Sequence, residues 1–600
     1  MGQRWGTNQR EAEGIGDRGM KVKVKYLTTV KDITKKSNEE FELASGTLAE
    51  LLNLIERKYS LRKNLKDILV IVNGQTVWEN FDSHKLSESD DIIIGPIIAG
   101  GSAFVTEDCK GCGSCARECP KNAIEIRELN GKKMAYVNST LCVSCGACKK
   151  VCEFDAIIIL PSEGVRCTSC PVFCIIKEGE YGACKRYKNE KGKLVLARRI
   201  SAPAEKKLGE PLVYGVGAGN TYPDFVPAPV IVEDNIDGVD VVTVVSATPL
   251  SFSFLKLKID TDEFIGLEGE AVYRDGRKIG MVVTEEYGSK MIDIGGVNTL
   301  QGKFGLTAAR TIVDIANGRE VELRVGKKNW IKIRLGKPPV INGKKVRKMR
   351  AGCGSAVIGM FAPYLKNVAD EVIVLDSHII GLLSEHYAGK YLGMRYSGII
   401  PWGVKSTDGR YFGEHGDGIG GTPIKDPLDA IKEIDFNYAW EGMRVLITDT
   451  TGEHLSMFEL RGRTLKEIEP TEEAKRVVKM ISDTCEDSRV SALFCGGVGG
   501  SARSGVAKYP KKVTEAVHKG LVRLTVGGAP AFVLPGGGIN FYVDVEKIKG
   551  KDPFTYVPTP AIVAPIEYTM KKKVYREIGG HMGSIVSYRE FLKKYEIELL

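Results

Sequence analysis

The stretch CKGCGSCARECP, from Cys109 to Pro120, and the stretch CVSCGACKKVC, from Cys142 to Cys152, decide how this chain is organised. Each separates three cysteines by two residues and places a fourth three residues further on. Of the 15 cysteines in the 600 residues, all but three lie between Cys109 and Cys184. The first 20 residues lack the apolar segment of a secretory leader, so these closely spaced thiols indicate metal binding rather than disulfides.

The spacing of each run is that of bacterial ferredoxins, in which three thiolates hold one [4Fe–4S] cluster and the fourth binds the other cluster. For the first cluster we therefore predict the ligands Cys109, Cys112, Cys115 and Cys152. For the second cluster we predict Cys142, Cys145, Cys148 and Cys119. Structural zinc, the alternative, favours paired Cys-x2-Cys motifs over a trio plus one. Residues 105–162 are thus predicted to form a ferredoxin-like domain with two [4Fe–4S] clusters.

A third group of thiols follows within residues 163–190, and it consists of Cys167, Cys170, Cys174 and Cys184. Four cysteines so close together predict a third metal site, for which an iron–sulfur cluster is favoured over zinc and over free thiols. Clusters in series carry single electrons. The remaining residues would therefore have to supply an acceptor that collects electrons in pairs.

The region before the cysteines has the pattern of a small β-rich domain. Lys21–Tyr26 alternates polar and apolar residues, as a half-buried strand does. Thr47–Glu50 forms a capping box that predicts the start of a helix. Ile68–Val72 then leads into a turn at Asn73-Gly74, the signature of a hairpin. Residues 1–19 show no pattern and are predicted to be a disordered leader.

The order of these elements resembles the ubiquitin-like β-grasp of the small MoaD/ThiS-like sulfur carriers over residues 20–101. The resemblance extends to Gly100-Gly101, where those carriers end in a carboxylate that is converted to a thiocarboxylate. Here Ser102 and the rest of the chain follow, so no carboxylate exists at Gly101 without cleavage. Two interpretations remain: a β-grasp module retained for docking, with a Gly-Gly linker, or a processed sulfur carrier.

The rest of the chain is a large Gly-rich α/β region. Strand candidates extend from Val230–Val232 to Val490–Phe494, and helices alternate with the later ones. We predict a β-rich domain at 200–345 and an α/β domain at 346–600. The expected fold class is therefore multidomain α/β and α+β, with a β-grasp domain, a ferredoxin-like domain and a large α/β catalytic region.

Glycine-rich turns in this region are candidate cofactor sites. The strand Ser491–Phe494 precedes a G-x-G-x-x-A pattern, in which free amides can face the phosphate of a flavin, either FAD or FMN. The predicted cofactor-binding residues are Gly497, Gly499, Gly500 and Ser501. Arg350–Ser355, with Asp376 ending the next strand, is an incomplete version of the same pattern. A solvated surface loop is the alternative for both.

Few histidines are available for acid–base chemistry, since the chain has seven. His415 and His581 are each followed or preceded by glycine, which exposes the ring, and we predict that one of them is a proton donor. Asp417 or Glu567 would orient it. For His415 the alternative is a solvated turn at 413–418.

Two groups of residues carry a further resemblance. Arg166–Pro171 with Gly182–Tyr187, and Pro558–Glu567 with Gly579-Gly580-His581, look like the iron–sulfur reductase family typified by 6-hydroxynicotinate reductase, over about residues 105–600. This resemblance implies an anaerobic, ferredoxin-linked flavin reductase that saturates a carbon–carbon bond of an electron-poor ring. The β-grasp domain is not part of that pattern and leaves the substrate open.

Net charge and the length of apolar runs limit the classes of function that remain. The net charge of +9 is mild for this length, so no nucleic-acid partner is expected, although a basic surface would suit an acidic redox protein such as ferredoxin. No apolar run approaches the roughly 18 residues that a membrane span requires, and we expect a cytoplasmic protein that acts on a small molecule, as a monomer or an oligomer. The rival function is a non-catalytic electron- or sulfur-delivery subunit for assembly of a molybdopterin- or tungsten-type cofactor, or for oxidoreductases that carry one.

Overall fold

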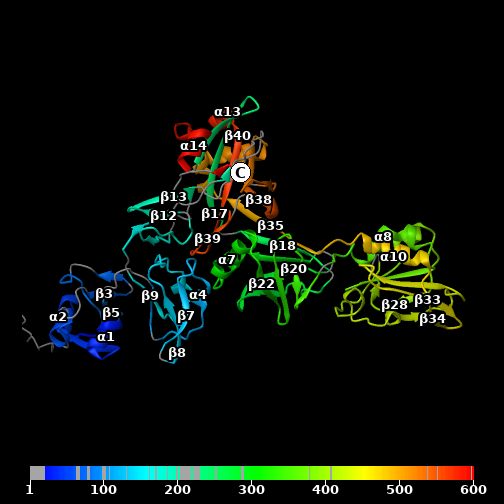
Figure 1. The fold of residues 1–600 in the computed structure, drawn as a ribbon, viewed down its shortest axis with the longest axis horizontal. Coiled ribbons are helices and arrows are strands. Elements are labelled where there is room, and N and C mark those ends of the chain that lie inside the picture. The colour runs from blue at the N-terminus through cyan, green and yellow to red at the C-terminus, as the bar shows by residue number, and fades with distance from the viewer. Residues whose placement is uncertain are drawn as a thin grey trace, which may run out of the picture. The chain divides into compact units, whose positions relative to one another are not determined.

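The computed structural model divides the chain into two compact units (Figure 1). The N-terminal unit holds residues up to 167 with 174–183 and 188–195, and the C-terminal unit holds 168–173, 184–187 and 196–600. The structure describes residues 20–599 except 62–67, 74, 78–80, 97–102, 107, 130, 161–162, 169–171, 186, 197–200, 203–217, 220–229, 251–252, 262, 286–289, 347, 378, 406–408, 537, 550–551 and 596–597. The predicted leader 1–19 and the Gly100-Gly101 pair lie outside the described residues.

Residues 20–96 form a β-grasp domain with a five-stranded sheet in the order β2-β1-β5-β3-β4. The strands are β1 (Met20–Tyr26), β2 (Asn38–Leu43), β3 (Ile68–Val72), β4 (Gln75–Val77) and β5 (Ile92–Pro96). Helices α1 (Thr28–Thr34) and α2 (Leu48–Tyr59) complete the domain. The predicted helix start is confirmed, because the Thr47 side chain accepts a hydrogen bond from the Glu50 amide. Leu48, Leu51 and Ile55 of α2 are buried in one core with residues of β1 and β5.

The ferredoxin-like part of the same unit consists of two small antiparallel sheets and two one-turn helices. Strand β6 (Ala103–Val105) pairs with β9 (Ile157–Ile159), and β7 (Ile124–Leu129) pairs with β8 (Lys132–Val137). The helices are α4 (Ser114–Arg117) and α5 (Ala147–Lys150). Two further hairpins follow, formed by β10 (Val165–Arg166), β11 (Ile175–Ile176), β12 (Tyr187–Glu190) and β13 (Lys193–Leu196). Leu160, directly after β9, is buried with Leu27, Ile71 and Ile93 of the β-grasp domain.

In the C-terminal unit, strands from the two ends of the region pair with each other. β17 (Val239–Leu250) lies antiparallel to β40 (Ala561–Lys571), which also pairs with β36 (Val522–Val526). β18 (Phe254–Asp260) lies between β21 (Lys290–Gly295) and β35 (Arg489–Val498), and β35 also pairs with β38 (Ile539–Asp544). The structure therefore divides this region differently from the predicted boundary at 346, because strands before that point pair with strands after 488.

Residues between β25 (Lys344–Lys345) and β35 form an inserted α/β body. Its seven-stranded sheet has the order β29-β30-β27-β26-β32-β33-β34. The strands are β29 (Val404–Lys405), β30 (Arg410–Tyr411), β27 (Ile379–Leu382), β26 (Glu371–Asp376), β32 (Arg444–Asp449), β33 (Leu455–Arg461) and β34 (Thr464–Ile468). Helices α8 (Gly354–Leu365) and α10 (Glu472–Asp483) pack on one face through an apolar core. Among the described residues, no helix is long and apolar enough to cross a bilayer.

The Glu39 carboxylate connects several elements of the β-grasp domain through polar contacts. Its carboxylate accepts hydrogen bonds from Tyr26 (3.2 Å), Tyr59 (2.8 Å) and Lys58 (2.8 Å), and it pairs with Lys36. Burial alone would raise the pKa of this carboxyl group, but hydrogen bonds from Lys36, Lys58 and Tyr59 outweigh burial and lower the pKa to about 2. The contacts of Glu39 thus connect β2 with β1 and with the end of α2.

Replacing Glu39 with Gln should weaken the β-grasp domain by about 1–2 kcal/mol at pH 7, since the lysine partners are half exposed and screened. Because the pKa is lower in the folded state, this stabilisation is complete above the unfolded pKa near 4.5 and is lost as the pH falls to about 2. Hydrogen exchange of the β1 and β2 amides in the full-length protein measures the local opening. Glu42→Gln, at an exposed position of the same strand, should leave exchange unchanged. Equal protection in both variants would contradict the assigned role of Glu39.

Candidate functional site

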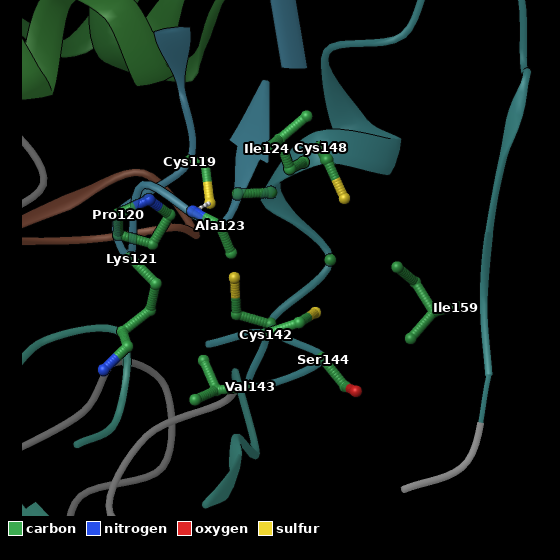
Figure 2. Close-up of a pocket in the computed structure, with 13 residues that line it drawn as sticks. Cys119, Pro120, Lys121, Ala123, Ile124, Cys142, Val143, Ser144, Cys148 and Ile159 are labelled. Atoms are coloured by element: carbon green, nitrogen blue, oxygen red, sulfur yellow. Dashed lines mark hydrogen bonds between the residues drawn. The ribbon is translucent and has the colours of Figure 1, made fainter. Parts of the chain in front are cut away.

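One cavity of the ferredoxin-like part brings together cysteines from both motifs. Cys119 of the first motif lines it with Cys142, Cys145 and Cys148 of the second. Figure 2 shows the sulfur atoms of Cys119, Cys142 and Cys148 turned toward the same space. The empty volume is about 330 Å³, part of which is open to solvent. These are the four cysteines predicted as ligands of the second cluster.

The other four cysteines also combine both motifs. Cys115 lies close enough to Cys109, Cys112 and Cys152 for their charges to act on it, and Cys152 belongs to the second motif. Burial, with a smaller contribution from these neighbours, raises the pKa of the Cys115 thiol to about 11. Burial likewise raises the pKa of Cys145 to about 12. Free thiols here would remain protonated, so the thiolate form requires a bound cationic centre.

The local backbone explains how short loops can surround a cluster. Gly113 and Gly146 adopt left-handed conformations, with φ of 75° and 74°, directly before the one-turn helices that carry Cys115 and Cys148. Backbone amides point at the sulfur atoms: Ala123 N lies 3.2 Å from Cys119 Sγ, and Ala156 N lies 3.3 Å from Cys152 Sγ. Such amide–sulfur hydrogen bonds stabilise the reduced cluster and raise its reduction potential.

The described residues hold no group of three or more His, Cys, Asp or Glu side chains arranged around a single metal ion. Tetrahedral zinc needs sulfur atoms about 2.3 Å from one point. The preference for a cluster over zinc rests on the spacing of the two motifs.

The third cysteine group is described only in part. Cys167 and Cys174 are both buried, and the Cys167 amide donates to the Cys174 carbonyl at 2.8 Å in the β10–β11 hairpin. Cys170 lies outside the described residues, and Cys184 belongs to the other unit. The third metal site stays a prediction.

The candidate acid–base residues His415, Asp417 and His581 each have a defined partner in the structure. The His415 ring stacks on Phe264, with ring centroids 4.2 Å apart. Asp417, two residues on, is exposed and pairs with Lys425 at 3.3 Å. His581 Nε2 lies 3.3 Å from the Ser504 carbonyl. The Asp417 carboxylate is thus directed to a lysine.

Glu567 is fully buried in the centre of β40, between β17 and β36. Its carboxyl group accepts from Thr525 at 2.5 Å and from the Gly528 amide at 3.3 Å. Burial raises its pKa to about 8, so it holds a proton at neutral pH. Arg503 of helix α11 (Gly500–Val506) acts electrostatically on the next residue, Tyr568, and α11 also carries the Ser504 that contacts His581. Successive strand residues face opposite sides of a sheet, so Glu567 and Tyr568 point to different faces of β40.

The predicted flavin turn at Gly497, Gly499, Gly500 and Ser501 does not have the geometry of a nucleotide-binding unit. β35 continues through Gly497, which pairs with Asn540 of β38, and both neighbours of β35 are antiparallel to it. The following helix α11 has seven residues. A phosphate-binding turn needs a free glycine loop between a parallel strand and a longer helix, so these residues do not fit a flavin phosphate.

The structure also brings together four buried charged side chains that the sequence did not indicate as a group. Lys290 pairs with Glu285 and Arg350 pairs with Asp376, and the side chains of all four are at most 2% exposed. Burial raises the pKa of Glu285 to about 7, while Lys290 and Arg350 oppose this rise. Arg350 and Asp376 were visible in the sequence as part of a glycine-rich turn. Glu285 and Lys290 carried no such signal, since charged residues usually lie at the surface.

Paired replacements test which cysteines share a cluster. Cys119→Ala with Cys145→Ala should cost about four irons per chain, because both residues bind one cluster. Cys119→Ala with Cys112→Ala should cost about eight, because each then removes a ligand of a different cluster. Iron and sulfide content of anaerobically purified protein measures the loss relative to the unmodified chain. The reverse pattern would mean that each motif binds its own cluster.

Comparison with known proteins agrees with this division of the chain. Residues 24–101 match the ThiS family, and residues 108–156 match the 4Fe–4S dicluster domain. Two solved structures are similar to a short part of the chain. One, from Pyrococcus furiosus and described as a molybdopterin converting factor subunit 1, is 25% identical and covers 13% of this chain and 99% of its own, with a TM-score of 0.12. The other, small archaeal modifier protein 1 from Methanosarcina acetivorans, is 21% identical and covers 14% and 98%, with a TM-score of 0.12.

The 6-hydroxynicotinate reductase of Eubacterium barkeri is 52% identical over 493 residues, which is 81% of this chain and 99% of that protein. The two ligand sets and this similarity identify an iron–sulfur oxidoreductase with two [4Fe–4S] clusters. The chain belongs to the 6-hydroxynicotinate reductase family and carries in addition a ThiS-like N-terminal domain.

Proposed function

We propose that this protein is a ferredoxin-linked reductase that saturates a carbon–carbon double bond in an electron-poor ring, such as that of 6-hydroxynicotinate. The observation that carries the proposal is the 52% identity to the Eubacterium barkeri reductase over almost its whole length. In such a reaction the ring gains two electrons and two protons, and two molecules of a reduced one-electron carrier are oxidised.

The electrons enter through the ferredoxin-like part in this proposal. Cys112 is the exposed cysteine among the eight predicted cluster ligands. Lys110 and Lys133 are exposed near it, and Arg117 donates to the Cys112 carbonyl at 3.2 Å. Positive charge around an exposed cluster edge attracts an acidic redox protein and speeds its docking. These residues support ferredoxin, or another acidic electron carrier, as the partner.

Single electrons must be combined into a pair before a ring double bond can be reduced. A bound flavin, FAD or FMN, would supply this chemistry. Because the Gly497–Ser501 turn does not fit a flavin phosphate, no residue of the chain is assigned to it.

The β-grasp domain acts as a docking module in this proposal. Its residues Leu27, Ile71 and Ile93 are buried together with Leu160 after the second cluster motif, which favours a fixed attachment over a released carrier. Sulfur delivery is the second candidate function, supported by the match to the ThiS family. Mass spectrometry of the native protein separates the two, because delivery requires a fragment that ends at Gly101.

The reductase proposal predicts that 6-hydroxynicotinate reoxidises the protein. After anaerobic reduction, addition of this ring should restore the visible absorption of the oxidised iron–sulfur centres with a stoichiometry of two electrons per ring. Benzoate, a ring that resists reduction, serves as the control. Iron, sulfide and flavin content per chain are measured on the same preparation. If the ring leaves the reduced centres unchanged, the proposed activity is wrong for this chain.

A further inference from the structure

The inserted α/β body joins the rest of the C-terminal unit through two adjacent connections. Lys348 and Asp487 form a β-bridge, and the Met349 amide donates to the Glu486 carbonyl at 2.8 Å. Arg350 directly follows this double connection. The buried charge cluster therefore lies where the insertion meets the part of the chain that carries Glu285 and Lys290, and seams between domains are common places for ligand sites.

The insertion presents the carboxyl ends of two parallel strands at this seam. β26 and β32 are the parallel pair of the sheet, with Leu375 opposite Asp449, and Asp376 is the last residue of β26. The Asp376 carboxylate accepts from the Gly354 amide at 3.2 Å, at the start of the 12-residue helix α8. In open α/β sheets, ligands bind beyond the carboxyl ends of parallel strands.

At the seam, the Glu285 carboxyl group uses only one of its two oxygens in the ion pair. Among the described residues, the buried Oε2 of Glu285 has no hydrogen-bond partner, while its Oε1 pairs with Lys290. A buried carboxyl oxygen without a partner is costly, and a catalytic role or a bound water or ion is among the explanations for one. Arg350 and Asp376 are near enough to act on this carboxyl group, so all four charges belong to one site.

The segments that carry these charges are also connected to an aromatic pair. Phe264 lies after β18, and Ile259 of β18 is opposite Lys290 in the sheet. The Phe264 ring stacks on His415. The loop that carries His415 is fixed to the end of β26, because the Ser377 amide donates to the Gly420 carbonyl at 2.7 Å. A half-buried aromatic pair can pack against a flat ring, and the buried cations can hold negative charge on it.

We propose that this seam is where the substrate ring binds, with Arg350 and Lys290 stabilising negative charge on the ring and Glu285 donating one of the two protons that the ring gains. The inference rests on the proposed function. The second proton comes from water, Glu285 regains its proton from solvent, and the two electrons come from the reduced one-electron carrier.

The charge balance of the site suits an anionic ligand when Glu285 is protonated. The charged groups that face Glu285 are Lys290 and Glu268 from its own part of the chain, and Arg350 and Asp376 from the insertion. Protonation of Glu285 removes one negative charge from this group, so fewer carboxylates oppose the binding of an anion beside Lys290 and Arg350. Above about pH 7 the ionised Glu285 carboxylate restores that negative charge and repels the ligand. Binding of the ring is thereby coupled to one bound proton.

The test uses the full-length protein, reduced anaerobically and mixed with 6-hydroxynicotinate. Glu285→Gln should be reduced by dithionite as fast as the unmodified protein, but its reoxidation by the ring should slow roughly 10²-fold or more. Arg350→Lys should raise KM about 10-fold or more. The KM of the unmodified protein should increase above about pH 7, and this increase should be absent in Glu285→Gln.

Glu371→Gln is the matched control. Glu371 is a fully buried carboxyl group at the opposite end of β26, where it accepts from Ser384 and Ser397. This variant should lose stability but keep the KM and its pH dependence. If Glu285→Gln and Arg350→Lys react like the unmodified protein, or lose no more activity than Glu371→Gln, the ring is bound elsewhere.

Hydrogen exchange of the unmodified protein keeps the inference testable if the variants do not fold. 6-Hydroxynicotinate should slow exchange at 350–355 and 413–421, and unchanged exchange there would overturn the site. If the ring does not reoxidise the unmodified protein, the proposed function fails. Protection at the seam in that same experiment would still support ring binding there.

Discussion

The structure of the N-terminal unit depends on an exchange of ligands between two short motifs. Cys119 reaches the cavity of the second motif, and Cys152 lies with the cysteines of the first. Neither half can complete a cluster without the other, so cluster binding and folding of this part are coupled. The exchange also keeps the two clusters close to each other, as one-electron transfer between them requires.

Local features of the sequence were sufficient to predict this unit. The ligand spacing, the capping box at Thr47 and the alternation in β1 each act within a few residues, and the structure has them as expected. The boundary at 346 could not be obtained in that way. It depends on pairs such as Val245 with Glu567, which lie far apart in the chain, and an alternating pattern does not say which strand will be the neighbour.

The candidate sites also differ in whether their residues are close together or far apart in the chain. Cysteine ligands are recognisable because their spacing along the chain is the spacing of the site. Glu285, Lys290, Arg350 and Asp376 come from separate segments, so their meeting could not be inferred from position alone.

Glu371 of the inserted body and Glu285 at the seam are both buried carboxyl groups, but their hydrogen bonding differs. Both oxygens of Glu371 are used: Oε1 accepts from the Val372 and Ser384 amides at 3.0 Å, and Oε2 accepts from the Ser384 and Ser397 hydroxyls. This fold can therefore satisfy both oxygens of a buried carboxyl group. Glu285 is equally buried but keeps one oxygen without a partner beside two cations. Preoriented charges that are incompletely satisfied in the resting protein can stabilise a charge that develops during a reaction, which a complete hydrogen-bond network cannot do.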